Sequence, residues 1–163
     1  MTEVDDPVIG RIRLNHRWWE CTRHVSFLDV TLQGRIDPEQ RGGDVSDKQR
    51  RVYQSIMRLP AATQTLMEAP IFANYLKIRD LVEDDAMPDI ADAAGIWIHL
   101  DVRAVLIPRH RASKYSYFFV EAECGWEPEH GLEVLFRDGA ILQVTQQEGL
   151  SMNQAWSLRY INE

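Results

Sequence analysis

Apolar and polar residues alternate along the amino-terminal part of the chain in a way that predicts strands. Within residues 25–33, Leu28, Val30 and Leu32 fall on one side and polar residues mostly on the other, which is typical of a half-buried strand. Residues 17–21 precede this stretch and are expected to form its antiparallel partner. The chain therefore begins with a predicted strand pair.

The middle of the chain changes to a helical period. Ser46 and Gln49 have the spacing of a capping box, in which each side chain bonds the backbone amide of the other residue. Pro60 ends this helix, and a second helix is predicted over residues 62–82, with Pro70 expected to kink or restart it. The buried face of the first helix is predicted to hold Val52, Ile56 and Leu59.

A period of two returns in the last third of the chain. Strands are predicted over residues 96–103, 115–124, 132–136, 140–146 and, as a further short segment, 156–160. In the clearest of them, Phe118, Val120 and Cys124 share one face with Ala122. Asp138-Gly139 is a type I′ turn signal, because this turn needs positive φ at both central positions. The last strands should therefore form a meander.

The order of elements predicts an α+β fold, with an antiparallel sheet made of the amino-terminal strand pair and the carboxy-terminal meander. Two helices are expected to pack on one face of that sheet. The 163 residues, of which 45% are apolar, suit a single domain over residues 1–163, with residues 1–10 loose.

Charge and composition narrow the class of function. The net charge of −7 argues against nucleic-acid binding, and no apolar run is long enough to span a bilayer. The acidic amino terminus has none of the features of a secretory signal, so we expect a cytoplasmic protein. Cys21 and Cys124 are then expected to be buried thiols rather than a disulfide.

The common motifs for nucleotide binding, nucleophilic hydrolysis and zinc binding are absent from the sequence, and no cofactor is expected. Glu127, Glu129 and His130 are the best candidates for a metal or acid-base site, because carboxylates and imidazole can bind a divalent ion or relay a proton. The favoured interpretation is structural, with Trp126 filling the hairpin end and Pro128 stiffening the turn. We therefore assign no catalytic residue and no metal ligand.

Aromatic residues are more numerous than one face of a sheet requires. They either form an exposed interface, flanked by arginine and glutamate, or cover the second face of the sheet. Both interpretations stay open for the residues concerned, which are Trp18, Trp19, Trp97, Tyr115, Tyr117 and Phe119.

Residues 126–132, Trp-Glu-Pro-Glu-His-Gly-Leu, are followed by Val-Leu-Phe-Arg-Asp-Gly at 134–139. This hairpin resembles the carboxy-terminal hairpin of an uncharacterised bacterial domain family. Gln49, Tyr53 and Tyr75 are similar to further features of that family, so the resemblance covers residues 17–147. It implies a small cytoplasmic bacterial protein, and some family members look like immunity proteins encoded beside secreted toxins.

We therefore expect a non-enzymatic cytoplasmic protein that binds a protein partner, with toxin neutralisation as the most specific version. One alternative is a metal-dependent or acid-base enzyme that uses the loop of Glu127, Glu129 and His130. Another is a homo-oligomeric structural subunit, such as a homodimer. Partner contacts are predicted around that loop, on one strand face and in the acidic segment 80–92, at Trp126, Glu127, Glu129, His130, Glu121, Glu123, Tyr117, Asp84 and Asp85.

Overall fold

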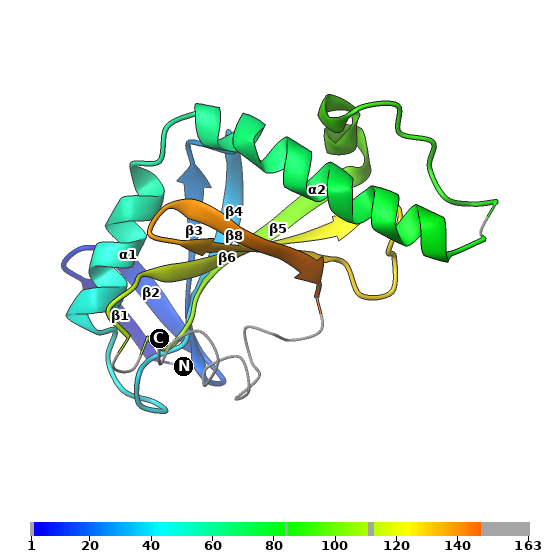
Figure 1. Cartoon of the computed structure of the whole chain (residues 1–163). Coiled ribbons are helices and arrows are strands. Elements are labelled where there is room, and N and C mark those ends of the chain that lie inside the picture. Colours follow the sequence, from blue (N-terminus) through cyan, green and yellow to red (C-terminus); the bar gives the residue numbers. More distant parts are fainter. Residues whose placement is uncertain (1, 84, 111–112, 148–163) are drawn as a thin grey trace.

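A computed structural model of the chain describes residues 2–83, 85–110 and 113–147. These residues form a single open sheet of eight strands in the order β1-β2-β3-β4-β5-β6-β7-β8 (Figure 1). The strands are β1 (Thr2–Asp6), β2 (Gly10–Asn15), β3 (Trp18–Val25), β4 (Val30–Ile36), β5 (Leu100–Ile107), β6 (Tyr117–Cys124), β7 (Leu132–Arg137) and β8 (Ala140–Gln146).

The predicted α+β fold with a purely antiparallel sheet is wrong. All eight strands belong to one sheet, which forms most of the fold and is mostly antiparallel. Its parallel pair is β4 and β5, with Gly34 opposite Val105. The helices connect these two strands, so the chain leaves the sheet after β4 and returns beside it in the same direction. Alternation of side chains is the same in parallel and antiparallel strands, which is why the sequence did not reveal this pairing.

The first helix, α1 (Asp47–Met57), begins as predicted. Ser46 and Gln49 form both bonds of the capping box, and the predicted Val52 and Ile56 are buried. The second helix, α2 (Ala62–Leu81), runs as one continuous helix through Pro70.

Two segments predicted as strands have other structures. A 3₁₀ helix, η1 (Ala93–His99), replaces the beginning of the strand expected over 96–103. Residues 26–29 form the turn between β3 and β4, so the strand expected over 25–33 begins only at Val30. Phe27 and Leu28 are buried in this turn, and their burial explains the strand-like pattern.

The amino terminus is also more ordered than predicted. Residues 1–10 were expected to be loose, but Thr2–Asp6 pair with β2, and Asp6 accepts hydrogen bonds from the amides of Val8 and Ile9. The short strand predicted over 156–160 lies outside the described residues. None of the helices described is both long and apolar enough to cross a membrane.

The main core lies between the helices and one face of the sheet. Val52 and Ile56 of α1, Ile71 and Tyr75 of α2 and Ile96 of η1 join this cluster. From the sheet it takes buried inward side chains of β2 to β7, among them Ile12, Trp19, Leu32, Val105, Phe118, Val134 and Phe136. Phe118, Val120 and Cys124 share this face, as the alternation predicted.

The opposite face of the sheet carries a second, smaller cluster. Leu106, Tyr117, Phe119 and Leu135 are all at most 3% exposed, and Trp18, Tyr115 and Leu142 pack against them. Of the two interpretations of the aromatic residues, Tyr117 and Phe119 therefore follow the second, because they pack on the second face of the sheet.

Candidate functional site

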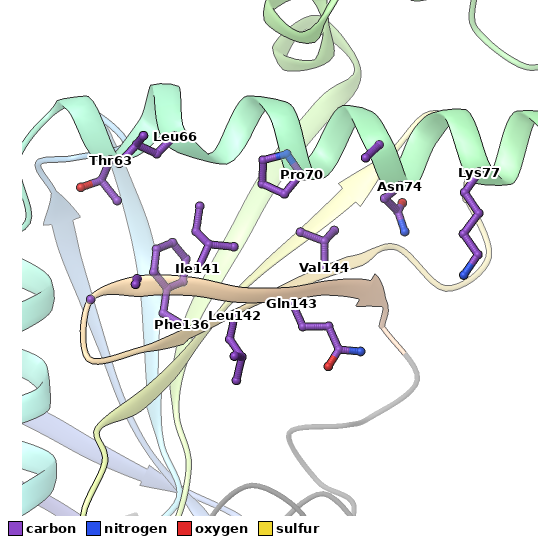
Figure 2. Close-up of a pocket in the computed structure, with 13 residues that line it drawn as sticks. Thr63, Leu66, Pro70, Asn74, Lys77, Phe136, Ile141, Leu142, Gln143 and Val144 are labelled. Atoms are coloured by element: carbon purple, nitrogen blue, oxygen red, sulfur yellow. The ribbon is translucent and has the colours of Figure 1, made fainter.

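A groove of about 650 Å³ runs between α2 and the last strand, β8 (Figure 2). Its lining residues come from α2, β7, β8 and the turn between these two strands. They are Thr63, Leu66, Pro70, Ala73, Asn74 and Lys77 of α2, Phe136 of β7, and residues 139–144 of the turn and β8.

Three of the α2 residues that line the groove, Leu66, Pro70 and Ala73, are apolar. Pro70 and Ala73 project little from the helix, which leaves space between the helix and the strand. Leu66 is 68% exposed at this site, although apolar side chains of its size are usually buried. An exposed apolar side chain beside an apolar groove is typical of a binding surface.

The strand β8 forms the other wall, and the register shift between Leu135 and Phe136 of β7, which leaves Leu142 as an extra residue on β8, interrupts the alternation of its side chains. Ile141 and Val144 point toward α2, whereas Leu142 and Gln143 point away from it (Figure 2). Ile141 and Val144 pack against the main core, and Leu142 packs against the second cluster. Within the part of the chain that the structure describes, β8 is the last strand of the sheet and pairs only with β7.

Two polar residues mark one end of the groove. Lys77 lies near the carboxyl end of β8 (Figure 2), and none of the ion pairs found among the described residues includes it. Asn74 accepts a hydrogen bond from the indole nitrogen of Trp126 at 3.2 Å. The loop that contains Trp126 therefore adjoins the groove and holds one of its side chains.

That loop is the one in which a site was predicted, and its main residue is not at the surface. Trp126 is 3% exposed and packs edge to face on Tyr75, with 5.6 Å between the ring centroids. Cys124 beside it is also buried, and burial raises the pKa of its thiol to about 11. A thiol with such a pKa is a poor nucleophile at neutral pH.

Glu127 holds the loop together through several bonds. Its carboxylate contacts His130 Nδ1 at 2.9 Å and accepts a bond from the side-chain amide of Gln146 at 2.7 Å. Its carbonyl accepts a bond from the Gly131 amide at 2.9 Å. These contacts agree with the favoured structural interpretation of the loop, while Glu129 and His130 lie exposed on it.

The other predicted contact residues differ in their exposure to solvent. Glu121 is 5% exposed and pairs with Arg35 at 3.2 Å, and Tyr117 is fully buried. Glu123 is exposed but pairs with Arg103 at 2.9 Å. Asp85 is exposed, whereas Asp84 lies outside the described residues. An exposed surface therefore cannot include Trp126, Glu121 or Tyr117, whereas Glu123 lines a shallow pocket together with Pro128 of the loop.

Sequence reasoning missed a polar cluster at the carboxyl ends of the parallel strands. Asp37 follows β4, and its carboxylate lies 3.2 Å from Nε of Arg109, which follows β5. Gln49 of α1 is fully buried and donates to the carbonyls of Asp37 and Pro108 at 2.6 and 3.1 Å. The capping box predicted the role of Gln49 at the start of α1. Its bonds to the ends of β4 and β5 could not be predicted, because they depend on the parallel pairing of these strands.

His110 completes this cluster and is fully buried. Its Nε2 accepts a hydrogen bond from the Tyr117 amide at 2.7 Å, and its own amide donates to Glu39 at 2.8 Å. Burial, with a smaller contribution from the charge of Lys48, lowers the pKa of His110 to about 4. The ring is therefore neutral at physiological pH and serves as a fixed hydrogen-bond acceptor.

Among the described residues, no group of three His, Cys, Asp or Glu side chains is placed to bind a metal ion.

Comparison with known proteins identifies the family but no relative of described function. No curated protein and no solved structure matches the chain. The model of one family, described as a domain of unknown function (DUF6985), matches residues 8–152. Because this match covers most of the 163 residues, the chain belongs to the DUF6985 family.

Proposed function

We propose that this protein is a non-enzymatic binding protein that holds a protein partner in the groove between α2 and β8. The observation that carries the proposal is an apolar groove of about 650 Å³ with Leu66, 68% exposed, in its wall. A protein partner would cover this apolar surface and gain the free energy of removing it from water. Asn74 and Lys77 supply the polar contacts that would orient the partner.

The roles of the candidate chemical groups favour binding over catalysis. Glu127 and His130 bond each other and the loop around them. Burial raises the pKa of both Cys21 and Cys124, which disfavours the reactive thiolate form. The contacts of these four residues therefore indicate that they stabilise the fold.

Neutralisation of a bacterial toxin in the cytoplasm is the most specific form of this proposal. It is supported by the resemblance of residues 126–132 to a hairpin found in members that look like immunity proteins. The net charge of −7 suits a partner with a basic surface, since opposite charges accelerate association. The groove would then hold part of the toxin, with the exposed Glu129, His130 and Asp85 available for outer contacts.

The test compares two substitutions on the same helix. Leu66 is 68% exposed and lines the groove, whereas Leu81 is 75% exposed and is absent from its lining. Tagged wild-type protein, Leu66→Asp and Leu81→Asp would each be expressed at the native level in the source organism. After crosslinking, the captured proteins would be measured by quantitative mass spectrometry.

We expect one stoichiometric protein with the wild type and with Leu81→Asp, and its loss with Leu66→Asp. Both variants should keep the melting temperature of the wild type, because neither side chain is buried. The absence of any stoichiometric protein with the wild type would contradict the binding function. A partner that Leu66→Asp retains would show that the protein binds through another surface.

A further inference from the structure

We propose that the partner binds by strand addition: an extended segment pairs with the outer edge of β8 while every second side chain enters the groove under α2. This inference rests on the proposed function and specifies how the groove is occupied. The segment would have apolar residues at alternate positions and a carboxylate at the end near Lys77.

The register of β7 and β8 determines which backbone groups of β8 are available. Arg137 and Ala140 flank the two-residue turn, and residues in this position exchange both hydrogen bonds in an antiparallel hairpin. The next pair, Phe136 and Ile141, is therefore not hydrogen-bonded. It follows that the amide and carbonyl of Ile141 point away from β7, toward the outer edge.

The irregularity between Leu135 and Phe136 does not change this pattern farther along the strand. A β-bulge places two residues of β8 opposite one residue of β7, so Val134 and Val144 form the following pair without hydrogen bonds. The backbone of Val144 then also points outward. An added strand can form hydrogen bonds with these outward groups, as a peptide does when it extends a sheet.

Side-chain geometry selects the kind of segment that fits. Ile141 and Val144 have outward backbone groups and side chains directed at α2 (Figure 2). A regular strand added beside them would alternate its own side chains between the two faces of the sheet, so that half of them would lie on the side of Leu66, Pro70 and Ala73. These positions require apolar residues, and the seven residues of β8 set the length of the paired segment at about seven residues.

Charge at one end gives the segment a direction. Lys77 lies by the carboxyl end of β8, and at the other end the groove is lined by Thr63 and Gly139, which carry no charge. A carboxylate of the partner near Lys77 would form an ion pair, whereas a cation there would be repelled. This asymmetry favours a partner segment over a second copy of β8, which would meet the groove through a two-fold axis.

The test uses a phage-displayed library of random nine-residue peptides selected on the full chain. The most enriched peptide would be synthesised in two forms, each with N-methyl groups on alternate amides in one of the two registers. Amide hydrogen exchange of the protein would be followed by NMR with and without the parent peptide. In this experiment Ala140 and Thr145 are controls within the same strand, because their amides face β7.

We expect enriched peptides in which apolar residues alternate and one end is acidic. N-methylation should weaken binding about tenfold in one register and little in the other, because only alternate amides bond a neighbouring strand. The peptide should slow exchange at Ile141 and Val144 at least about tenfold and leave Ala140 and Thr145 unchanged. Lys77→Glu should weaken binding of the acidic peptide about fivefold.

Several results would overturn strand addition. These are no enriched peptide, equal effects of both N-methyl registers, or a peptide that leaves exchange at Ile141 and Val144 unchanged. Slow exchange at these amides without peptide would show that something else already pairs with the edge of β8. If the exchange rate depends on protein concentration, the occupant is a second copy of the protein. If it does not, the occupant is residues 148–163 of the same chain. A partner lost with Leu66→Asp would still support the proposed function in each of these cases.

Discussion

Protonation of His110 should reduce the stability of the fold in mildly acidic solution. The ring is fully buried, and its Nε2 accepts a bond from the Tyr117 amide at 2.7 Å. A proton on this nitrogen would remove the acceptor and place a positive charge in the interior, near Lys48. Burial is the largest cause of the lowered pKa, the charge of Lys48 is the second, and Asp138 acts in the opposite direction.

The size of the effect follows from the two pKa values. The pKa of His110 is about 4 in the fold and 6.5 in the absence of the protein environment, a difference worth about 3 kcal/mol of stability. Because the folded pKa is the lower one, this stability is complete above pH 6.5 and is lost as the pH falls toward 4. Between pH 7 and pH 4.5 the expected loss from this residue is about 2 kcal/mol.

Urea unfolding of the wild type and of His110→Gln at both pH values measures this contribution. Glutamine keeps an oxygen that can accept from the Tyr117 amide, and it does not titrate. The carboxyl groups of the protein titrate equally in the wild type and the variant. One of them is Asp6: burial alone would raise its pKa, but hydrogen bonds from two amides and the contact with Arg50 lower it. The wild type should lose about 2 kcal/mol more than the variant, and equal losses would refute a buried neutral His110.

Three further predictions concern the stability of the fold and the buried thiols. Gln49→Ala should lower the free energy of unfolding by about 3 kcal/mol, because the buried carbonyls of Asp37 and Pro108 lose their donor. Gln54→Ala on the same helix should cost less than about 0.5 kcal/mol in the same urea titration. Similar losses in the two variants would contradict the role of Gln49 in holding the two strand ends. Gly139→Ala should cost about 1 kcal/mol in thermal unfolding, because Gly139 has a φ of +80°; an unchanged melting temperature would contradict the turn geometry. A thiol reagent at pH 8 should label Cys21 and Cys124 much more slowly in native protein than in urea, and fast native labelling would show that they are not buried.

The predictable parts of the fold depend on neighbours close in sequence. The helix start at Ser46 rests on bonds to a residue three positions away, and the turn at Asp138-Gly139 rests on the φ angles that these residues tolerate. The shared face of Phe118, Val120 and Cys124 follows from strand geometry alone. The turn at Phe27 was missed because burial by distant elements gave it the apolar pattern of a strand.

The candidate site was less predictable than the fold. The motif around Trp126 contains unusual residues, yet these residues close a hairpin, and Trp126 contacts the groove through a hydrogen bond to Asn74. The groove itself combines ordinary residues, such as Leu66 and Ile141, from segments that are far apart in the chain. No local pattern distinguishes an apolar residue beside a groove from one inside a core.

By itself, the sequence determined local geometry and the side of each element on which apolar residues lie. Only the tertiary structure decided that β4 and β5 pair in parallel, that Gln49 clamps their ends, and that α2 leaves a groove beside β8. The physical reason is that capping bonds and turn angles depend on a few adjacent residues. The choice of a neighbouring strand, and of what covers an apolar face, depends on the free energy of contacts between distant segments.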